Sequence, residues 1–353
     1  MSLDDRKKVI LQAIVDDYVT TCEPVGSKAL IDRHNFTLSS ATLRNEMADL
    51  EKLGYIEKPH TSAGRVPSDK GYREYVDSLM HVDMISDSEK KEIESRISTG
   101  VDEVTDLLKN ATSTLSAKTG YVSLAMTPVL RKSYLTQLKL LMIEPGKALV
   151  VVVLSAGVVK DKLVRIPNFL TDEQVNEISR AVEHQLAGKP LDEITLITVA
   201  SSVKNTSIPD SLLNQVLYEA YTAIKQADKL DVYFEGKHKI LAIPEFSDVD
   251  RARGLLNTLS DDGMVAGYVN ELGTEELTEE QEGKDSYMIR IGQEIALEGL
   301  ENCSFITTTY KVGDKISGNI GIIGPKRMEY SKVISQINFV RKTLNDEIKK
   351  INE

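Results

Sequence analysis

Apolar residues recur at helical spacing in several segments of the first eighty positions. Residues 4–20 place an apolar side chain every three or four positions, which predicts an amphipathic helix. Pro24 and Gly26 interrupt this pattern, and Ser27 is a suitable N-cap for a short second helix. A further helix is predicted from about Asp69. The pattern therefore indicates a small helical unit at the N-terminus.

The third helix of this unit carries the clearest signals. Ser39 is a favourable N-cap, and Leu38 stands at hydrophobic-staple spacing from Leu43. Gly54 can adopt the left-handed conformation that ends a helix. The predicted buried stripe consists of Leu43, Met47 and Leu50, and the opposite face carries Ser40, Ala41, Arg44, Asn45 and Ala48. Small residues let a helix approach a groove floor, and Arg and Asn can bond guanine and adenine edges.

Two short apolar pieces, 55–58 and 65–67, flank a turn rich in Pro, Ser and Gly. This arrangement predicts a hairpin, and a hairpin after such a helix is a wing. Its tip offers hydroxyls, backbone N–H groups around Gly64, and Arg65, which suit a phosphate or a minor groove. Two alternatives stay open: the polar helix face is only solvated, or the winged helix is a protein-interaction module.

Composition changes this picture in two respects. The 353 residues suffice for two or three domains, and the net charge of -11 argues against a broadly basic nucleic-acid-binding surface. Residues 1–80 hold eleven Lys/Arg and thirteen Asp/Glu, whereas 58–73 hold four cations and one acid. Any DNA contact must therefore come from a locally basic surface.

No run of about 18 apolar residues and no signal peptide are present, which predicts a chain that does not enter a membrane. Cys22 and Cys303 are far apart and belong to no metal-binding pattern, so both are predicted to be reduced thiols of a cytoplasmic protein.

The rest of the chain mixes helices and strands. Apolar residues between 93 and 115 predict one long amphipathic helix, weakest at Gly100, that either forms a dimer seam or covers a sheet. The Val-rich run within 149–154 suggests a strand buried on both faces. Predicted strands are 138–143, 149–154, 158–166, 287–291, 305–310 and 316–323.

Helices are predicted between these groups of strands, which suggests one domain interrupted by an insertion. Thr171 to Gln174 form a capping-box pattern, and a second helical stretch covers 212–224 with a broad apolar stripe. A second protomer is one candidate to cover that stripe. We predict a DNA-binding domain at 1–80, a second domain formed by 81–167 plus 246–353, and an inserted domain at 168–245.

Catalytic signals are missing from the sequence. The five histidines have no metal-ligand spacing, and the glycine-rich stretch 313–324 matches neither a dinucleotide-binding motif nor a Walker loop. We therefore predict that the chain is not an enzyme and that it binds neither a cofactor nor a metal ion.

Three motifs resemble the HrcA heat-inducible transcription repressors: the stretches 23–27, 39–51 and 59–73, read as EPVGS, SSATLRNEMADLE and PHTSAGRVPSDKGYR. The C-terminal stretch 318–330 agrees. Cys22, Ser40 and Lys326 depart from the residues expected at those positions, without placing DNA binding in doubt.

The resemblance implies a multidomain α+β fold with an N-terminal winged helix-turn-helix, a GAF-like α/β domain and an inserted α+β dimerisation domain. It also implies a homodimer that binds the inverted-repeat CIRCE operator of heat-shock chaperone operons as a repressor, with chaperonin modulating its activity. An alternative is a small-molecule-responsive transcription regulator that senses through the GAF-like domain. The predicted DNA-binding residues are Ser39, Ser40, Thr42, Arg44, Asn45, His60, Thr61, Ser62, Arg65 and Lys70.

Overall fold

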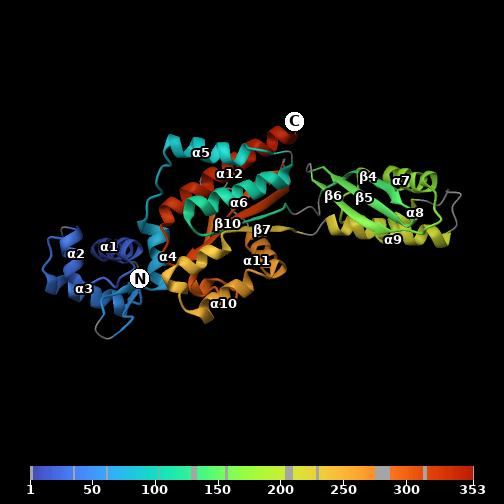
Figure 1. Ribbon diagram of the computed structural model, residues 1–353. Coiled ribbons are helices and arrows are strands. Elements are labelled where there is room, and N and C mark those ends of the chain that lie inside the picture. The colour runs from blue at the N-terminus through green and yellow to red at the C-terminus, as the bar shows by residue number, and fades with distance from the viewer. Residues whose placement is uncertain are drawn as a thin grey trace.

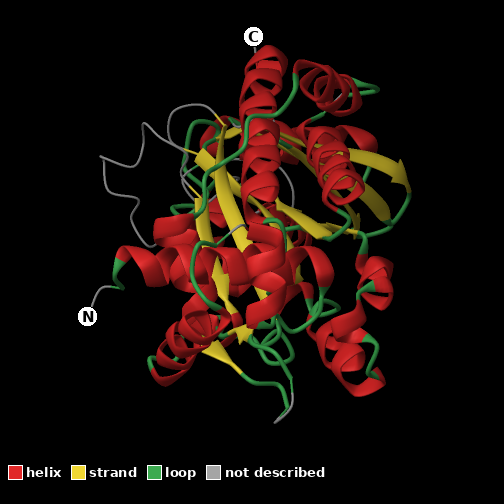
Figure 2. Cartoon of the chain, turned by 90° about the vertical axis from the view of Figure 1, so that its left-hand side faces the viewer, coloured by secondary structure: helices red, strands yellow, loops and turns green. Residues whose placement is uncertain are grey.

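Three bodies follow one another along the molecule, as the computed structural model in Figure 1 shows. We call them the N-terminal module (residues 3–80), the central body (residues 81–128 and 230–352) and the outer unit (residues 133–227). Figure 2 looks along this row from the N-terminal end, with the C-terminus of the chain at the top. The structure describes residues 3–34, 36–60, 63–101, 103–128, 133–155, 158–202, 210–227, 230–274, 287–312 and 316–352.

The N-terminal module is built from helices around a small two-stranded sheet. Its elements are α1 (Asp5–Thr21), α2 (Ser27–His34), α3 (Ser40–Lys52), β1 (Ile56–Glu57), β2 (Val66–Pro67), α4 (Asp69–Glu74) and the π-helix η1 (Tyr75–Leu79). The predicted succession of three helices, a hairpin and a fourth helix is confirmed. Ile14, Leu30, Leu43 and Leu50 are fully buried and join the three helices into one core.

The central body contains a five-stranded antiparallel sheet in the order β7-β3-β10-β9-β8. Its strands are β3 (Val122–Met126), β7 (Val232–Glu235), β8 (Tyr287–Ile291), β9 (Cys303–Val312) and β10 (Ile316–Pro325). The 3-10 helices η2 (Lys237–Ala242), η3 (Pro244–Phe246) and η5 (Gly292–Glu294) lie in its connections.

Both faces of this sheet are covered by helices, because alternate strand residues are apolar on each side. Ile306 and Ile322 belong to the core shared with α6 (Val104–Thr119) and α12 (Tyr330–Asn352), beside α5 (Asp87–Ser98). Phe305 and Ile323 face the other way, into a second core. That core includes residues of α10 (Val249–Thr258) and α11 (Asp262–Thr274).

The prediction of one long helix between 93 and 115 is wrong. The chain forms two helices, α5 and α6, and Gly100 between them has a φ of +65°. A left-handed residue cannot continue a right-handed helix, so the glycine ends the pattern that the spacing of apolar residues suggested. Both helices pack against α12 at the central sheet, as the sheet-covering alternative expected.

The outer unit holds a separate three-stranded antiparallel sheet in the order β4-β5-β6. Its elements are β4 (Leu135–Glu144), β5 (Lys147–Leu154), β6 (Val159–Arg165), α7 (Asp172–Leu186), α8 (Leu196–Ser201) and α9 (Asp210–Ala227). The predicted turn between β4 and β5 contains Gly146 with φ +90°, and the capping box at Thr171 is present.

The structure places the insertion between strands that the sequence pattern did not pair. Strands β4 to β6 were expected in the domain of 81–167, but they form their own sheet with α7 and α9. The insertion leaves after β3 and returns at β7, where Thr127 N donates to Asp231 O (3.0 Å) and Asp231 N donates to Thr127 Oγ1 (2.9 Å). Hydropathy identifies strands, but their partners follow from tertiary packing, which is why the boundaries 168–245 differ from this arrangement.

The Val-rich strand β5 is also different from its prediction. It is not buried on both faces: Val150 and Val152 are buried, whereas Val151 and Val153 between them are half-buried. The helices α7 and α9 pack against strands of this sheet and cover one face, and the other face of the sheet stays accessible.

Candidate nucleic-acid interface

Helix α3 is fixed in the module by one apolar stripe and one cap. Ser39 Oγ accepts a hydrogen bond from Thr42 N (3.1 Å), and the hydroxyls of Ser39 and Thr42 lie 2.9 Å apart. Leu43, Met47 and Leu50 are buried against α1 and α2. Since the helix is held by this face, its opposite face is directed outward.

Arg44 and Asn45 lie on that outward face, and both are exposed. Neither side chain forms a hydrogen bond or an ion pair with any residue that the structure describes. Arg offers a fork of donors, and Asn offers one acceptor and an NH₂ group, so both can read base edges in a major groove. The absence of competing partners leaves these groups available for an external ligand.

The N-termini of α2 and α3 lie next to each other, since Ser27 Oγ and Ser40 Oγ are 3.3 Å apart. Lys28, on α2, is exposed and has no ion pair with a described residue. Helix N-termini favour anions, so these residues suit a backbone phosphate. The predicted DNA-binding residues did not include Ser27 and Lys28, because the proximity of the two helix starts is a tertiary feature.

The hairpin of the module is short and is tied to the start of α2. Ile56 pairs with Pro67 and Glu57 with Val66, and a backbone bridge joins Val25 to Arg65. Val25 N donates to Arg65 O (2.8 Å), and Arg65 N donates to Val25 O (2.9 Å). His60 is exposed near the tip of the hairpin. The predicted contacts Thr61 and Ser62 lie outside the described residues.

Two predicted DNA-binding cations are engaged within the module itself. Arg65 donates to Glu51 Oε2 from Nε (2.9 Å) and pairs with it through Nη2 (2.8 Å), with a side chain only 15% exposed. Lys70 Nζ donates to Leu53 O (2.8 Å) and lies 4.2 Å from the centre of the Tyr55 ring. The structure therefore gives both cations an internal role as well.

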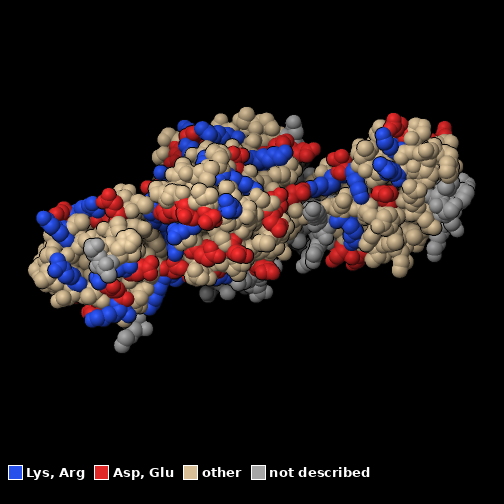
Figure 3. Space-filling view, turned by 60° about the horizontal axis from the view of Figure 1, so that its bottom comes forward, with Lys and Arg blue, Asp and Glu red and all other residues tan. Residues whose placement is uncertain are grey.

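The charged surface of the module is mixed, with basic and acidic side chains side by side (Figure 3). Buried carboxylates secure its helices: Asp17 accepts from Arg33 Nη1 (3.1 Å) and His34 Nε2 (2.8 Å). Burial raises the pKa of Asp16, although the Tyr75 hydroxyl that donates to it (2.8 Å) acts in the opposite direction. These contacts hold α1 against α2 and η1.

Ion pairs connect the module to the central body. Lys326 Nζ contacts Asp69 Oδ1 (2.6 Å), and Arg73 donates to both Glu294 and the carbonyl of Ile289. Arg327 pairs with Glu245 of the same body and also donates to Val19 O of the module (3.3 Å). The orientation of α3 relative to the central body is thus set by several charged contacts.

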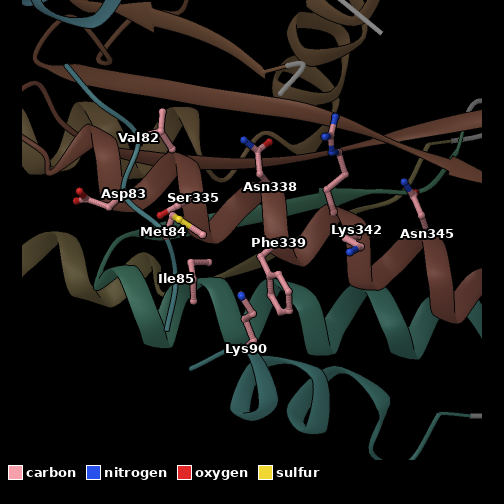
Figure 4. Close-up of a pocket in the computed structure, with 11 residues that line it drawn as sticks. Val82, Asp83, Met84, Ile85, Lys90, Ser335, Asn338, Phe339, Lys342 and Asn345 are labelled. Atoms are coloured by element: carbon pink, nitrogen blue, oxygen red, sulfur yellow. The ribbon is translucent and has the colours of Figure 1, made fainter. Parts of the chain in front are cut away.

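One cavity lies in the central body, and another lies at its border with the module. A groove of about 500 Å³ runs along α12, where Phe339 and Lys342 face Val82, Met84 and Ile85 of the linker (Figure 4). A second cavity of about 200 Å³ lies between the hairpin of the module and the central body.

Other chemical sites are scarce in the described part of the chain. No group of three or more His, Cys, Asp or Glu residues there is arranged to hold a metal ion. Cys22 and Cys303 are both unpaired, and burial raises the pKa of the Cys303 thiol to about 12. None of the described helices is long and apolar enough to cross a membrane.

Comparison with known proteins connects this architecture to a family. The model of the HrcA protein C terminal domain matches residues 105–334. The heat-inducible transcription repressor HrcA of Ruminiclostridium cellulolyticum is 42% identical over 352 residues, covering 99% of each chain. The repressor of the same name from Acetivibrio thermocellus is 40% identical and covers 99% of this chain and 98% of its own. A crystal structure described as a hypothetical protein at 2.2 Å resolution shares the fold, with TM-score 0.66, 24% identity, and coverage of 99% of this chain and 100% of that one.

The module with its outward helix and the full-length repressor relatives define a DNA-binding transcription regulator, and not an enzyme. Within that class, the chain belongs to the HrcA family of heat-inducible transcription repressors.

Proposed function

We propose that the chain represses heat-shock chaperone operons in the cytoplasm by binding an inverted-repeat operator of the CIRCE type as a homodimer. In this proposal the N-terminal module is a winged helix-turn-helix, with α3 in the major groove and the hairpin as its wing. The observation that carries the proposal is that Arg44 and Asn45, on a helix whose other face is buried, are exposed and have no partner among the residues that the structure describes. The family resemblance supports the operator type.

The contacts divide into base-reading and phosphate-binding groups. We assign base edges to Arg44 and Asn45, and phosphates to Ser27, Lys28 and Ser40 at the two adjacent helix starts. The polar residues Ser39, Thr42, His60 and Lys70 then support the interface at its margin. The contacts of α3 are expected to raise the affinity for the operator sequence over other sequences. The contacts at the helix starts are expected to raise the affinity for any DNA sequence alike.

A gel-shift titration at fixed salt tests this division, with a labelled inverted-repeat duplex and a scrambled duplex. Arg44→Ala is expected to lose about 1–3 kcal/mol of binding to the repeat, which is roughly five- to 150-fold, and little binding to the scrambled duplex. Arg96→Ala, a change of the same charge on α5, is the matched control and is expected to bind as the unaltered chain does. Equal losses on both duplexes would contradict the base-reading role of Arg44.

We propose that the central body is the GAF-like domain and that the outer unit, bounded by Thr127 and Asp231, is the inserted dimerisation domain. The accessible face of its sheet is apolar at one end: Leu141 is 45% exposed, Ile143 60% and Leu163 59%. The register aligns Leu141 with Leu149 and Leu149 with Leu163, which makes one apolar row across three strands. Contiguous exposed apolar surface of this kind favours association, and a second copy offers the same row.

Sedimentation of the full chain tests the dimer surface. Leu163→Asp is expected to shift the chain from dimer to monomer at micromolar concentration, because a charge would be buried in the apolar contact. Ile197→Asp changes an 80% exposed residue of α8 in the same unit and is expected to leave the dimer intact. If only the α8 variant dissociates the dimer, the sheet face is not the interface.

Modulation by chaperonin rests on the family resemblance. Adding chaperonin to the gel shift is expected to raise the fraction of chain that is active on the repeat without changing its preference over the scrambled duplex.

A further inference from the structure

The cavity of about 200 Å³ between the N-terminal module and the central body has polar walls from both sides. Tyr18, Glu57 and Tyr72 reach it from the module, and Arg251, Asn302 and Lys326 reach it from the central body. Its position coincides with the charged contacts that set the orientation of α3. A ligand in this cavity would therefore touch both bodies at once.

Tyr72 is the most informative residue in its wall. The residue is 2% exposed, and its oxygen is buried without a hydrogen-bond partner among the residues that the structure describes. Burial raises the pKa of this phenol, so the group keeps its proton and can donate. Buried polar groups are nearly always paired, so an unpaired one is explained by a bound water or ion, by local strain or by a functional role.

Other donors around Tyr72 are also unengaged. The Tyr18 hydroxyl, the Arg251 guanidinium and the Asn302 side-chain amide form no hydrogen bond or ion pair with a described residue. The charge of Glu245, which also lines the cavity, is compensated by Arg327. Glu57 remains as the one uncompensated acid among the described residues that line it. Lys326 is likewise paired with Asp69, so Arg251 and Glu57 remain as one cation and one acid. The N–H and O–H groups of Tyr18, Tyr72, Arg251 and Asn302 outnumber the unpaired acceptors of the described residues that line the cavity.

We propose that this cavity is a binding site for a small oxyanion, a carboxylate or a phosphate. The Tyr72 and Tyr18 hydroxyls and the Asn302 amide donate to its oxygens, and Arg251 supplies the opposite charge. Such charge-assisted hydrogen bonds are the strong ones. A volume of about 200 Å³ corresponds to roughly six or seven water molecules, which limits the ligand to a small metabolite.

Occupancy of the site would be coupled to DNA binding. This coupling rests on the proposed function, whereas the binding of the oxyanion itself does not. The ligand would add contacts across the junction already spanned by Lys326 and Asp69 and by Arg73 and Glu294. Because two α3 helices of a dimer must match two half-sites, a change in module orientation alters operator affinity.

Isothermal titration and thermal shift of the full chain test the site, with inorganic phosphate and succinate as separate probes and sodium chloride at equal ionic strength as control. Saturable binding with a stoichiometry of about one per chain is expected for at least one probe. Phosphate and succinate as separate arms distinguish the two sources of oxyanion. No saturable binding of either probe up to millimolar concentration would overturn the proposal.

Two variants locate the binding. Tyr72→Phe removes only the unpaired hydroxyl, and Arg251→Gln removes only the free charge, so each is expected to weaken binding about tenfold while the melting temperature without ligand stays the same. Arg253→Gln, two positions along α10 and 66% exposed at its side chain, is the matched control and is expected to bind normally. Equal affinities in all three variants would place the ligand elsewhere and overturn the assignment.

The gel shift with and without the bound probe separates this proposal from the proposed function. A probe-dependent change in operator affinity that is lost in Tyr72→Phe supports the coupling. Probe binding with no sequence-specific DNA binding would refute the operator proposal and leave the oxyanion site standing. Specific DNA binding with no probe binding would refute the oxyanion site alone.

Discussion

The Arg65–Glu51 pair holds the hairpin against the rest of its module. The same pair engages the Arg65 guanidinium and so limits its availability to DNA. Arg65 contacts Glu51 Oε2 at 2.9 Å and 2.8 Å, and the two side chains are 15% and 31% exposed. Hydrogen bonds to a charged group stabilise by about 1.5–3 kcal/mol, and partial exposure of Glu51 lowers this to about 1–2 kcal/mol. Most of that stabilisation acts locally, where the backbone bridge joins Val25 to Arg65.

Backbone hydrogen exchange at Val25 and Arg65 measures the local opening in the intact chain. Arg65→Ala and Glu51→Gln are each expected to lower protection there about five- to thirtyfold, which corresponds to 1–2 kcal/mol. The double variant is expected to lose no more than Glu51→Gln does, since the Arg65–Glu51 ion pair is lost only once and Glu51→Gln already removes the pair with Lys58 as well. Additive losses would show that the pair is not coupled and would refute the internal role of Arg65. Protection at Ile10, buried in α1, serves as the reference.

Two further outcomes follow from buried polar groups. Because burial raises the folded-state pKa of Asp16, its charged form lowers the stability of the fold above that pKa, and Asp16→Asn is expected to be more stable than the unaltered chain at neutral pH. This gain in stability should shrink as the pH falls through the raised pKa and vanish below the ordinary value of 3.8. A gain that persists at lower pH would exclude this cause. Tyr310 is fully buried and donates to Met126 O (2.7 Å), so Tyr310→Phe is expected to cost about 1–3 kcal/mol and lower the melting temperature by several degrees. Tyr218→Phe, at a 54% exposed position, is the control for the second experiment and should melt unchanged.

Local structure was largely accessible from the sequence, because each signal acts within a few residues. The Ser39 cap and the buried stripe of α3 follow from side-chain chemistry at fixed helical spacing. Gly54, with φ +80°, ends that helix as expected. The exposure of Arg44 and Asn45 follows from the same spacing, since a helix buried along one stripe turns its other face outward.

Pairing between distant segments was decided only by tertiary structure. Nothing in the residues of β3 and β7 indicates that they are neighbours across an insertion of about a hundred residues. Neither strand was predicted, and the predicted boundary at 245 placed β7 inside the inserted domain. The engagement of Arg65 by Glu51 and the unpaired hydroxyl of Tyr72 likewise depend on what the fold brings beside them. A sequence specifies which chemical group a residue carries, but whether that group is free to bind a ligand depends on the partners that packing supplies.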